Sequence, residues 1–224
     1  MKLLVLIMGS RELMYPHLSE NGVFATWGKL HIPNVEIYTY YGEYNKQEIR
    51  GHNIHLLKND KDCTGKTIEA FEFALKYFEF NYILRTTVST FVRLDILYKH
   101  LNNAPRVKYF SGYLVGNNPE SQFISGNNMI FSKDLIEDMI INKSYFLDKN
   151  SFTDDCVISH YIIWDKKIEV YENFSRPEFS GSIDVLKGTP KNVLENHIFF
   201  RCKTGYDRMQ DVEKLKYLYD IFYK

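Results

Sequence analysis

The sequence has few cysteines, no excess of charge of either sign and no long hydrophobic run. Its 224 residues include three cysteines, Cys63, Cys156 and Cys202, which lie far apart and form no C-x-x-C pair. Neither a disulfide framework nor a zinc cluster is therefore indicated. Lys plus Arg and Asp plus Glu both number 28. This balance excludes a general electrostatic attraction to nucleic acid or to an anionic membrane, so any phosphate site must be local.

No segment of the sequence approaches the roughly 18 uninterrupted apolar residues that a membrane-spanning helix needs. The apolar run at residues 3–8 is also shorter than the core of a signal peptide, and no small-residue cleavage site follows it. We therefore expect a soluble, cytoplasmic protein without a signal peptide or membrane span. Hydrophobic residues make up 45% and charged residues 25% of the chain, as in ordinary globular proteins, and we expect one domain over residues 1–224.

Short apolar runs alternate with segments of helical periodicity. Residues 2–9 resemble a strand buried on both faces, residues 35–42 and 81–86 are further strands, and residues 64–78 carry apolar side chains at helical spacing. This alternation predicts an α/β fold with a mostly parallel central sheet and helices on both faces. The remaining predicted strands are 53–57, 107–115, 123–131, 168–171 and 198–202, and the remaining predicted helices are 12–30, 92–101, 132–140, 154–164 and 212–222.

Ligands of such sheets bind beyond the carboxyl ends of the strands. Residues 9–11, 40–42 and 86–90 directly follow predicted strands and form the expected rim of a binding site. The rim and its neighbours supply candidates for contacts with a base, a ribose or phosphates, namely Gly9, Ser10, Arg11, Tyr40, Lys66 and Arg85.

Gly65, Lys66 and Thr67 open a predicted helix after a predicted strand, which is the setting of a phosphate-binding P-loop. That motif also requires glycine at the position of Asp60, where a carboxylate would repel the phosphates. A P-loop nucleotide kinase is therefore an alternative that Asp60 argues against.

Four segments, read in order, resemble nucleotide-sugar glycosyltransferases of the GT-A fold, in particular the inverting β-1,3-glycosyltransferase and Fringe-like group. The segments are residues 66–97, 123–140, 154–162 and 196–203. The resemblance implies a Rossmann-like GT-A domain that transfers a sugar, with inversion, from a UDP-linked donor to a hydroxyl of a glycan or glycoprotein. A non-catalytic nucleotide- or glycan-binding relative of the same fold is the second hypothesis.

In this group, a K-T-x-x-A helix precedes a strand that ends in an acidic D-x-D triplet, whose carboxylates hold Mn²⁺ or Mg²⁺ against the donor diphosphate. Here the triplet position has Thr87, Val88 and Ser89, as in bacterial and viral relatives that lack the acids. Two hydroxyls cannot replace two negative charges, so the sequence argues against metal binding. Thr86, Thr87 and Ser89 are candidates for hydrogen bonds to the donor, and a simple strand-end turn is the alternative.

Asp154 and Asp155 begin a predicted helix and resemble the acidic pair that faces the acceptor in this group. The resemblance implies that Asp155 is the general base for the acceptor hydroxyl. Asp154 would then have an orienting or a helix-capping role. The alternative is a helix-capping pair, because Asp is favoured at helix N-termini.

Two further groups of polar residues follow from the resemblance. Ser125, Gly126, Asn127 and Asn128 match the small-residue segment that passes close to the sugar, although an ordinary turn also favours Gly and Asn. His197, Arg201 and Lys203 alternate along a predicted strand and would make one of its faces basic. The resemblance implies His197 as a ligand of a metal or of the diphosphate, whereas Arg201 and Lys203 would neutralise a diphosphate without metal. An exposed basic edge strand is the alternative.

Overall fold

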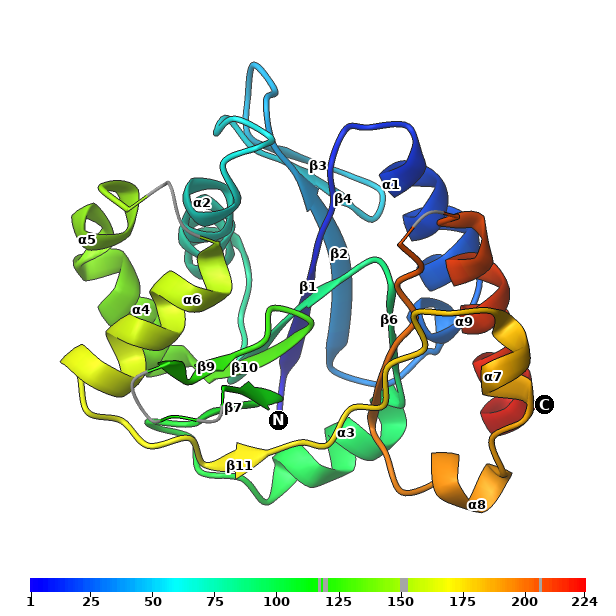
Figure 1. The fold of residues 1–224 in the computed structure, drawn as a ribbon. Coiled ribbons are helices and arrows are strands. Elements are labelled where there is room, and N and C mark those ends of the chain that lie inside the picture. Colours follow the sequence, from blue (N-terminus) through cyan, green and yellow to red (C-terminus); the bar gives the residue numbers. More distant parts are fainter. Residues whose placement is uncertain (117, 119–120, 150–152, 206) are drawn as a thin grey trace.

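An eight-stranded sheet forms the centre of the computed structural model, which describes residues 1–116, 118, 121–149, 153–205 and 207–224 (Figure 1). Its strands are β1 (Leu3–Met8), β2 (Val35–Tyr41), β3 (Glu48–Arg50), β4 (Asn53–His55), β5 (Tyr82–Thr87), β7 (Phe110–Gly112), β10 (Asn128–Ser132) and β11 (Glu172–Asn173). They lie in the order β11-β7-β10-β5-β1-β2-β4-β3.

The middle of the sheet is parallel. β1 pairs in parallel with β2 and with β5, and β2 pairs in parallel with β4, whereas β10 runs antiparallel to β5 and β7. All residues of β1 except Met8 are buried, because helices cover both faces of a central parallel strand. The α/β fold with a mostly parallel sheet is thus confirmed.

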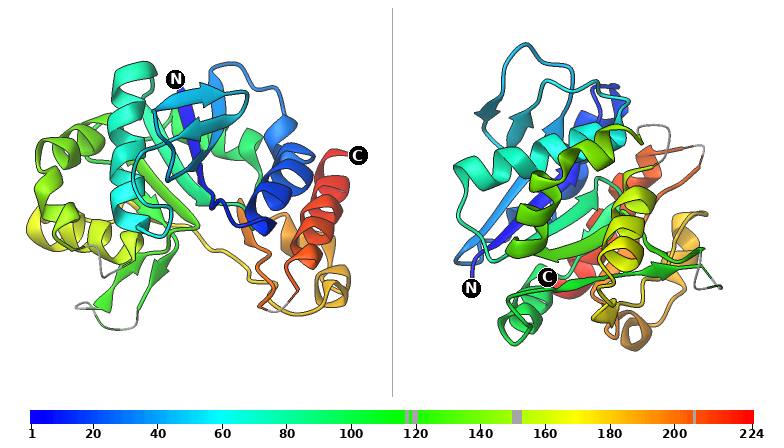
Figure 2. Two further views of the ribbon diagram at one scale, coloured as in Figure 1. Left: turned by 90° about the horizontal axis from the view of Figure 1, so that it is seen from above. Right: turned by 90° about the vertical axis from the view of Figure 1, so that its left-hand side faces the viewer.

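Alternate side chains of β1 enter two separate cores. Leu4 and Leu6 pack in one core with residues of α2 (Cys63–Tyr77), α4 (Lys133–Ile141), α5 (Lys143–Leu147) and α6 (Asp154–Ser159). Leu3, Val5 and Ile7 pack in the other core. Its helices are η1 (Leu18–Phe24), α3 (Leu94–Asn102), α7 (Ile183–Lys187), α8 (Lys191–Leu194) and α9 (Met209–Tyr223). The view from above in Figure 2 shows these two helical layers on either side of the sheet. None of the described helices is long and apolar enough to cross a membrane.

Two short antiparallel ribbons extend from the sheet. β6 (Thr90–Val92) pairs with β12 (Phe199–Arg201), and β8 (Leu114–Val115) pairs with β9 (Phe123–Ile124). The first ribbon joins the segment after β5 to the C-terminal part of the chain, although more than a hundred residues separate them. It thereby positions the predicted basic residues next to the end of β5.

Several predicted elements differ from the structure. The strand predicted at 168–171 is wrong, since pairing with β7 begins only at Glu172. The helix predicted somewhere within 12–30 is made up of α1 (Met14–His17), the π-helical η1 and a 3₁₀ turn, η2 (Trp27–Lys29). The one predicted at 154–164 continues from α6 into a π-helical segment, η4 (His160–Asp165). β3, β6, α5, α7 and α8 were not predicted, because elements of three to five residues show no clear periodicity.

A buried ion pair joins the end of β1 to the start of α2. The Nζ of Lys66 lies 2.9 Å from Oδ1 of Asp60 and also donates to the carbonyl oxygens of Gly9 and Asp60. The Asp60 carboxylate accepts hydrogen bonds from Ser10 Oγ and from the backbone N–H groups of Arg11 and Gly42. The ammonium group that a P-loop would direct at phosphates is therefore fully occupied inside the protein.

The pKa of Asp60 reflects this environment. Burial raises it, but the hydrogen bonds from Ser10 and Lys66 and from two backbone amides outweigh burial and hold the pKa below its ordinary value. A carboxyl group with a lowered folded-state pKa stabilises the protein above its unfolded pKa. This contribution is lost as the pH falls through the folded-state pKa.

Replacing Lys66 by Met should lower the free energy of unfolding by about 3–5 kcal/mol, because the Asp60 carboxylate would stay buried without its cation. Urea denaturation of the wild-type and variant proteins measures this loss. Lys61→Met, in the same loop but exposed, is the control and should change stability by no more than about 0.5 kcal/mol. Equal effects of the two substitutions would contradict a structural role for Lys66.

Candidate active site

A cavity of about 310 Å³ opens at the carboxyl ends of β1 and β5, the location expected for ligands of a parallel sheet. The predicted site residues that line it are Arg85, Thr87, Ser89, Gly126, Asn127, Asp154, Asp155, Arg201 and Lys203. The four segments of the sequence resemblance therefore meet at one place. The cavity lining also contains residues that were not predicted, namely Met8, Tyr15, Cys63, Val88, Thr153 and Arg208.

Arg85 and Asp154 form a buried ion pair in the wall of the cavity. The Nη2 of Arg85 lies 2.5 Å from Oδ2 of Asp154, and the two side chains are only 1% and 4% exposed. Thr67 Oγ1 donates to the same carboxylate oxygen, and Tyr40 in turn donates to Thr67. Burial raises the pKa of Asp154 against the opposing effect of Arg85, and burial also raises the pKa of Tyr40, to about 12. Asp154 is thus held in place by buried partners.

Asp155 is half-buried and belongs to the first turn of α6. Its Oδ2 accepts the backbone N–H of Gly126 at 2.9 Å, and its Oδ1 accepts the backbone N–H of Cys156 at 3.0 Å. A carboxylate offers about four lone-pair positions, so two hydrogen bonds fix its orientation and leave acceptor capacity for a ligand. Neither Asp154 nor Asp155 is the N-cap of α6, which is Thr153.

Gly126 lies between Arg85 and Asp155. The Nη1 of Arg85 donates to the carbonyl oxygen of Gly126, while the N–H of Gly126 donates to Asp155. A methyl group at this position would collide with the Arg85 guanidinium. The sequence predicted that the backbone at Gly126 passes close to a sugar ring. In the structure, the side chain that lies close to Gly126 is that of Arg85.

The hydroxyl groups at the triplet position are engaged within the protein. Asn127 Nδ2 donates to Thr87 Oγ1 at 3.2 Å, and Ser89 Oγ donates to Asp211 Oδ2 at 2.9 Å. Arg208 Nη2 donates to the same Ser89 oxygen at 2.6 Å, while its Nε donates to Asp211 at 2.7 Å. A divalent cation at Ser89 would have to displace this guanidinium.

The donor set does not fit Mn²⁺ or Mg²⁺, which take carboxylate oxygens in preference to hydroxyls. Asp154 is bound by Arg85, Asp211 by Arg208, and Asp155 by two backbone N–H groups. Within the part of the chain that the structure describes, no group of three or more His, Cys, Asp or Glu side chains could hold a metal ion.

Besides Arg85, three cationic side chains line the same cavity: Arg201 at the end of β12, Lys203 after it, and Arg208 immediately before α9. Lys203 has a lowered pKa because it is partly buried and because Arg208 and Arg201 are near. Glu178 lies 3.7 Å from Nε of Arg201, which is too long for a hydrogen bond. Sequence analysis missed Arg208, and its closeness in sequence to Arg201 and Lys203 was the only signal for it.

The other predicted residues lie outside this lining. Ser10 and the backbone of Arg11 bind Asp60, and Nη1 of Arg11 donates to the carbonyl oxygen of Glu43. Lys66 donates to the carbonyl oxygen of Gly9 beside its ion pair with Asp60. Tyr40 is connected to Asp154 through the hydroxyl of Thr67. These residues support the wall of the cavity from the side of β1 and β2.

Thr86 and Asn128 are fully buried: Thr86 donates to the carbonyl oxygen of Asn127, and Asn128 Oδ1 accepts the N–H of Tyr113. Ser125 Oγ accepts a hydrogen bond from Arg176. His197, the predicted metal ligand, lies outside the cavity lining, and its Nδ1 is 2.8 Å from Ser175 Oγ.

Gly126→Ala should lower the free energy of unfolding by about 1–3 kcal/mol, because the added methyl group must push the Arg85 guanidinium away from Asp154. Thermal or urea unfolding measures the change. At Gly181 an added methyl group meets nothing within 4 Å, so Gly181→Ala is the matched control. If Gly126→Ala were as stable as this control, the contact between Arg85 and Gly126 would not constrain the site.

No protein-family model and no curated protein matches the chain. Among solved structures, it is similar to a glycosyltransferase involved in the glycosylation of the major capsid of PBCV-1, with a TM-score of 0.58 and 11% identity over 97% of this chain and 100% of that chain. It also aligns with the apo-form glycosyltransferase GlyE of Streptococcus pneumoniae TIGR4, with a TM-score of 0.48 and 15% identity over 96% of this chain and 60% of that chain. The first alignment spans both chains and shows that this protein has the fold of a glycosyltransferase, as its resemblance to the GT-A group predicted.

Proposed function

We propose that the protein is an inverting glycosyltransferase that moves a sugar from a nucleoside diphosphate, UDP in the first instance, to a hydroxyl of a glycan or glycoprotein. One observation carries the proposal. In a chain with a glycosyltransferase fold, a single cavity at the carboxyl edge of the sheet combines the Asp155 carboxylate with Arg201, Lys203 and Arg208. The similar solved structure is that of a glycosyltransferase involved in the glycosylation of the major capsid of PBCV-1, which favours a glycan or glycoprotein acceptor here as well.

Asp155 is the proposed general base. It accepts the proton of the acceptor hydroxyl as the acceptor oxygen attacks the anomeric carbon. The bond between that carbon and the diphosphate oxygen breaks, and its electron pair leaves with the diphosphate. Retention through a covalent intermediate would need a carboxylate nucleophile as well as this base. Asp154 is unsuited to that role because it is 3% exposed and bound by Arg85 and Thr67, which supports a single displacement with inversion.

Arg201, Lys203 and Arg208 are the proposed stabilisers of the leaving diphosphate. Developing negative charge is best stabilised by fixed cations and hydrogen-bond donors. Arg208 is held in position by Ser89 and Asp211, so its geometry exists before the donor binds. Since the donor set does not fit Mn²⁺ or Mg²⁺, we propose that these side chains act in place of a metal.

The structure bears differently on the two alternatives. A P-loop kinase would need the Lys66 ammonium for ATP, but this group is buried with Asp60 and Gly9 as its partners. The non-catalytic relative would keep donor binding and lose transfer, and only measurements on the protein separate it from the enzyme.

Asp155→Asn should reduce sugar transfer by about 10²- to 10⁴-fold, because the amide cannot accept the hydroxyl proton, while donor binding stays unchanged. Initial transfer rates and the donor-induced shift of the melting temperature measure the two effects. Asp148→Asn, at an exposed position, serves as the control. Unchanged transfer by Asp155→Asn would remove Asp155 from the mechanism.

UDP or a UDP-sugar should raise the melting temperature in the presence of EDTA, by about 5–10 °C at a concentration a hundred times the Kd. Lys203→Met should reduce the shift, because it removes a cation from the cavity, whereas Lys187→Met, at an exposed position of α7, should not.

A panel of nucleoside diphosphates, nucleotide sugars and ATP, each with and without Mn²⁺, tests the proposal and its alternatives by the same melting measurement. A shift that requires Mn²⁺ would refute metal independence. Shifts with ATP alone would favour the kinase, and donor binding without transfer to any acceptor would favour the non-catalytic relative.

A further inference from the structure

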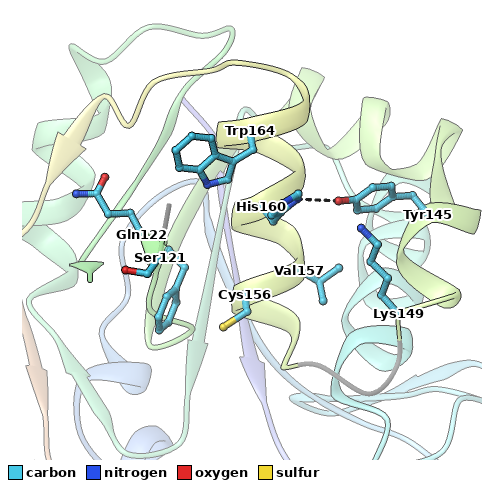
Figure 3. A pocket seen from close by; sticks show the side chains of 9 residues that line it. Ser121, Gln122, Tyr145, Lys149, Cys156, Val157, His160 and Trp164 are labelled. Carbon is cyan, nitrogen blue, oxygen red and sulfur yellow. Dashed lines mark hydrogen bonds between the residues drawn. The ribbon is translucent and has the colours of Figure 1, made fainter. Parts of the chain in front are cut away.

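A second cavity, of about 370 Å³, shares the first turn of α6 with the candidate active site. Thr153, Asp154 and Asp155 line the first cavity, and the next two residues, Cys156 and Val157, line the second. Figure 3 shows Cys156, Val157, His160 and Trp164 arranged along this helical segment, with Tyr145 and Lys149 on one side and Ser121 and Gln122 on the other.

We propose that this second cavity binds the acceptor as a neutral saccharide whose ring packs against an aromatic side chain, Trp164 in the first instance. The assignment of the ligand as the acceptor rests on the proposed glycosyltransferase function. The volume lies at the lower end of the range of small-molecule sites, about 300–1,000 Å³, which suits one or two sugar rings better than a protein surface.

The lining has the mixture of groups that a sugar requires. A pyranose ring has an apolar C–H face and a rim of hydroxyls, so it is bound by flat aromatic surfaces bordered by neutral hydrogen-bonding groups. Phe123, Tyr145 and Trp164 supply the aromatic surfaces, and Gln122 and His160 supply hydrogen-bonding groups.

The charges of the described lining disfavour a cationic ligand, and its lysine is engaged by an aromatic ring. Lys149 is the only Lys or Arg in the described lining, and its Nζ lies 3.7 Å from the centroid of the Tyr145 ring. Tyr145 Oη lies 3.0 Å from Nδ1 of His160, so this hydrogen bond leaves the Nε2 atom for a ligand. No carboxylate is present in the described lining of this cavity, in contrast to the first one.

The position of the cavity connects it to the proposed base. Asp155 Oδ1 accepts the backbone N–H of Cys156, so the base and the cavity wall are consecutive residues joined by a hydrogen bond. Consecutive Cα atoms are about 3.8 Å apart. A saccharide that occupies the second cavity therefore lies beside the helical turn that carries Asp155.

The two tryptophans of the chain make this site directly measurable. Trp27 is fully buried and donates its indole N–H to the carbonyl oxygen of Thr90, whereas Trp164 is half-buried in the cavity lining. Iodide should therefore quench the fluorescence of Trp164 alone. Methyl glycosides of glucose, galactose and N-acetylglucosamine, added without any donor, should protect Trp164 from iodide, and at least one of them should do so in a saturable manner.

Variants test whether Trp164 contributes to binding. Saturation-transfer NMR should show about tenfold weaker binding of the protecting glycoside to Trp164→Ala, and Tyr77→Ala, an exposed aromatic on α2, should bind it normally. Should Trp164→Ala fail to fold, Gln122→Ala serves as the second variant, because it keeps the fluorescent reporter and removes a polar group of the same cavity.

The outcomes separate this inference from the proposed function. Sugar transfer that is weakened by Trp164→Ala mainly through a higher acceptor KM supports the acceptor site. Transfer that is unaffected by both cavity variants overturns it and leaves the glycosyltransferase intact. Saccharide binding without transfer to any acceptor overturns the acceptor assignment together with the proposed function. Protection of Trp164 by benzyl alcohol but by none of the methyl glycosides overturns the choice of a saccharide.

Discussion

The buried ion pair between Arg85 and Asp154 is the interaction on which the arrangement of the candidate active site depends. Two opposite charges are removed from water in the wall of the cavity, and each is costly to bury without the other. Arg85 comes from the central strand β5, and Asp154 from the first turn of α6. The pair therefore fixes the start of a helix against the end of the sheet.

The consequences of this pair extend to the proposed base through the backbone. Arg85 donates to the carbonyl oxygen of Gly126, and the N–H of the same residue donates to Asp155. One glycine thus links the buried guanidinium to the carboxylate of the proposed base. Asp154 and Asp155 are adjacent in the sequence and of the same residue type, but Asp154 is buried and Asp155 is half-buried. This difference in burial distinguishes their proposed roles.

The sequence predicted the architecture well because its central strands are continuous apolar runs, and β1, β2 and β5 lie close to their expected positions. It also predicted the segments that meet at the cavity. It could not predict that Lys66 would be neutralised by Asp60, because a spacing of six residues does not by itself bring two side chains together. Nor could it predict that Gly126 makes room for Arg85, because that contact joins residues 41 apart in sequence. Arg208 was missed for the same reason. Nothing in the local sequence indicates that its side chain reaches Ser89. The second cavity combines residues of two resembling segments with Tyr145 and Trp164, which belong to none of them.

The hydrogen bonds around Ser89 also bear on the order in which the protein folds. Ser89 and Asp211 are 122 residues apart in sequence, and Arg208 lies next to α9. Contacts of such large sequence separation form slowly, because the entropy of closing the intervening loop must be overcome first. Consider a folding chain in which β1, β2 and β5 have already paired but α9 has not yet docked. Such a chain would contain the sheet and α6, but the Arg208 guanidinium would not yet contact Ser89. The candidate active site is thus completed by one of the most distant contacts of the fold, and binding of the proposed donor would report that the chain has reached its native state.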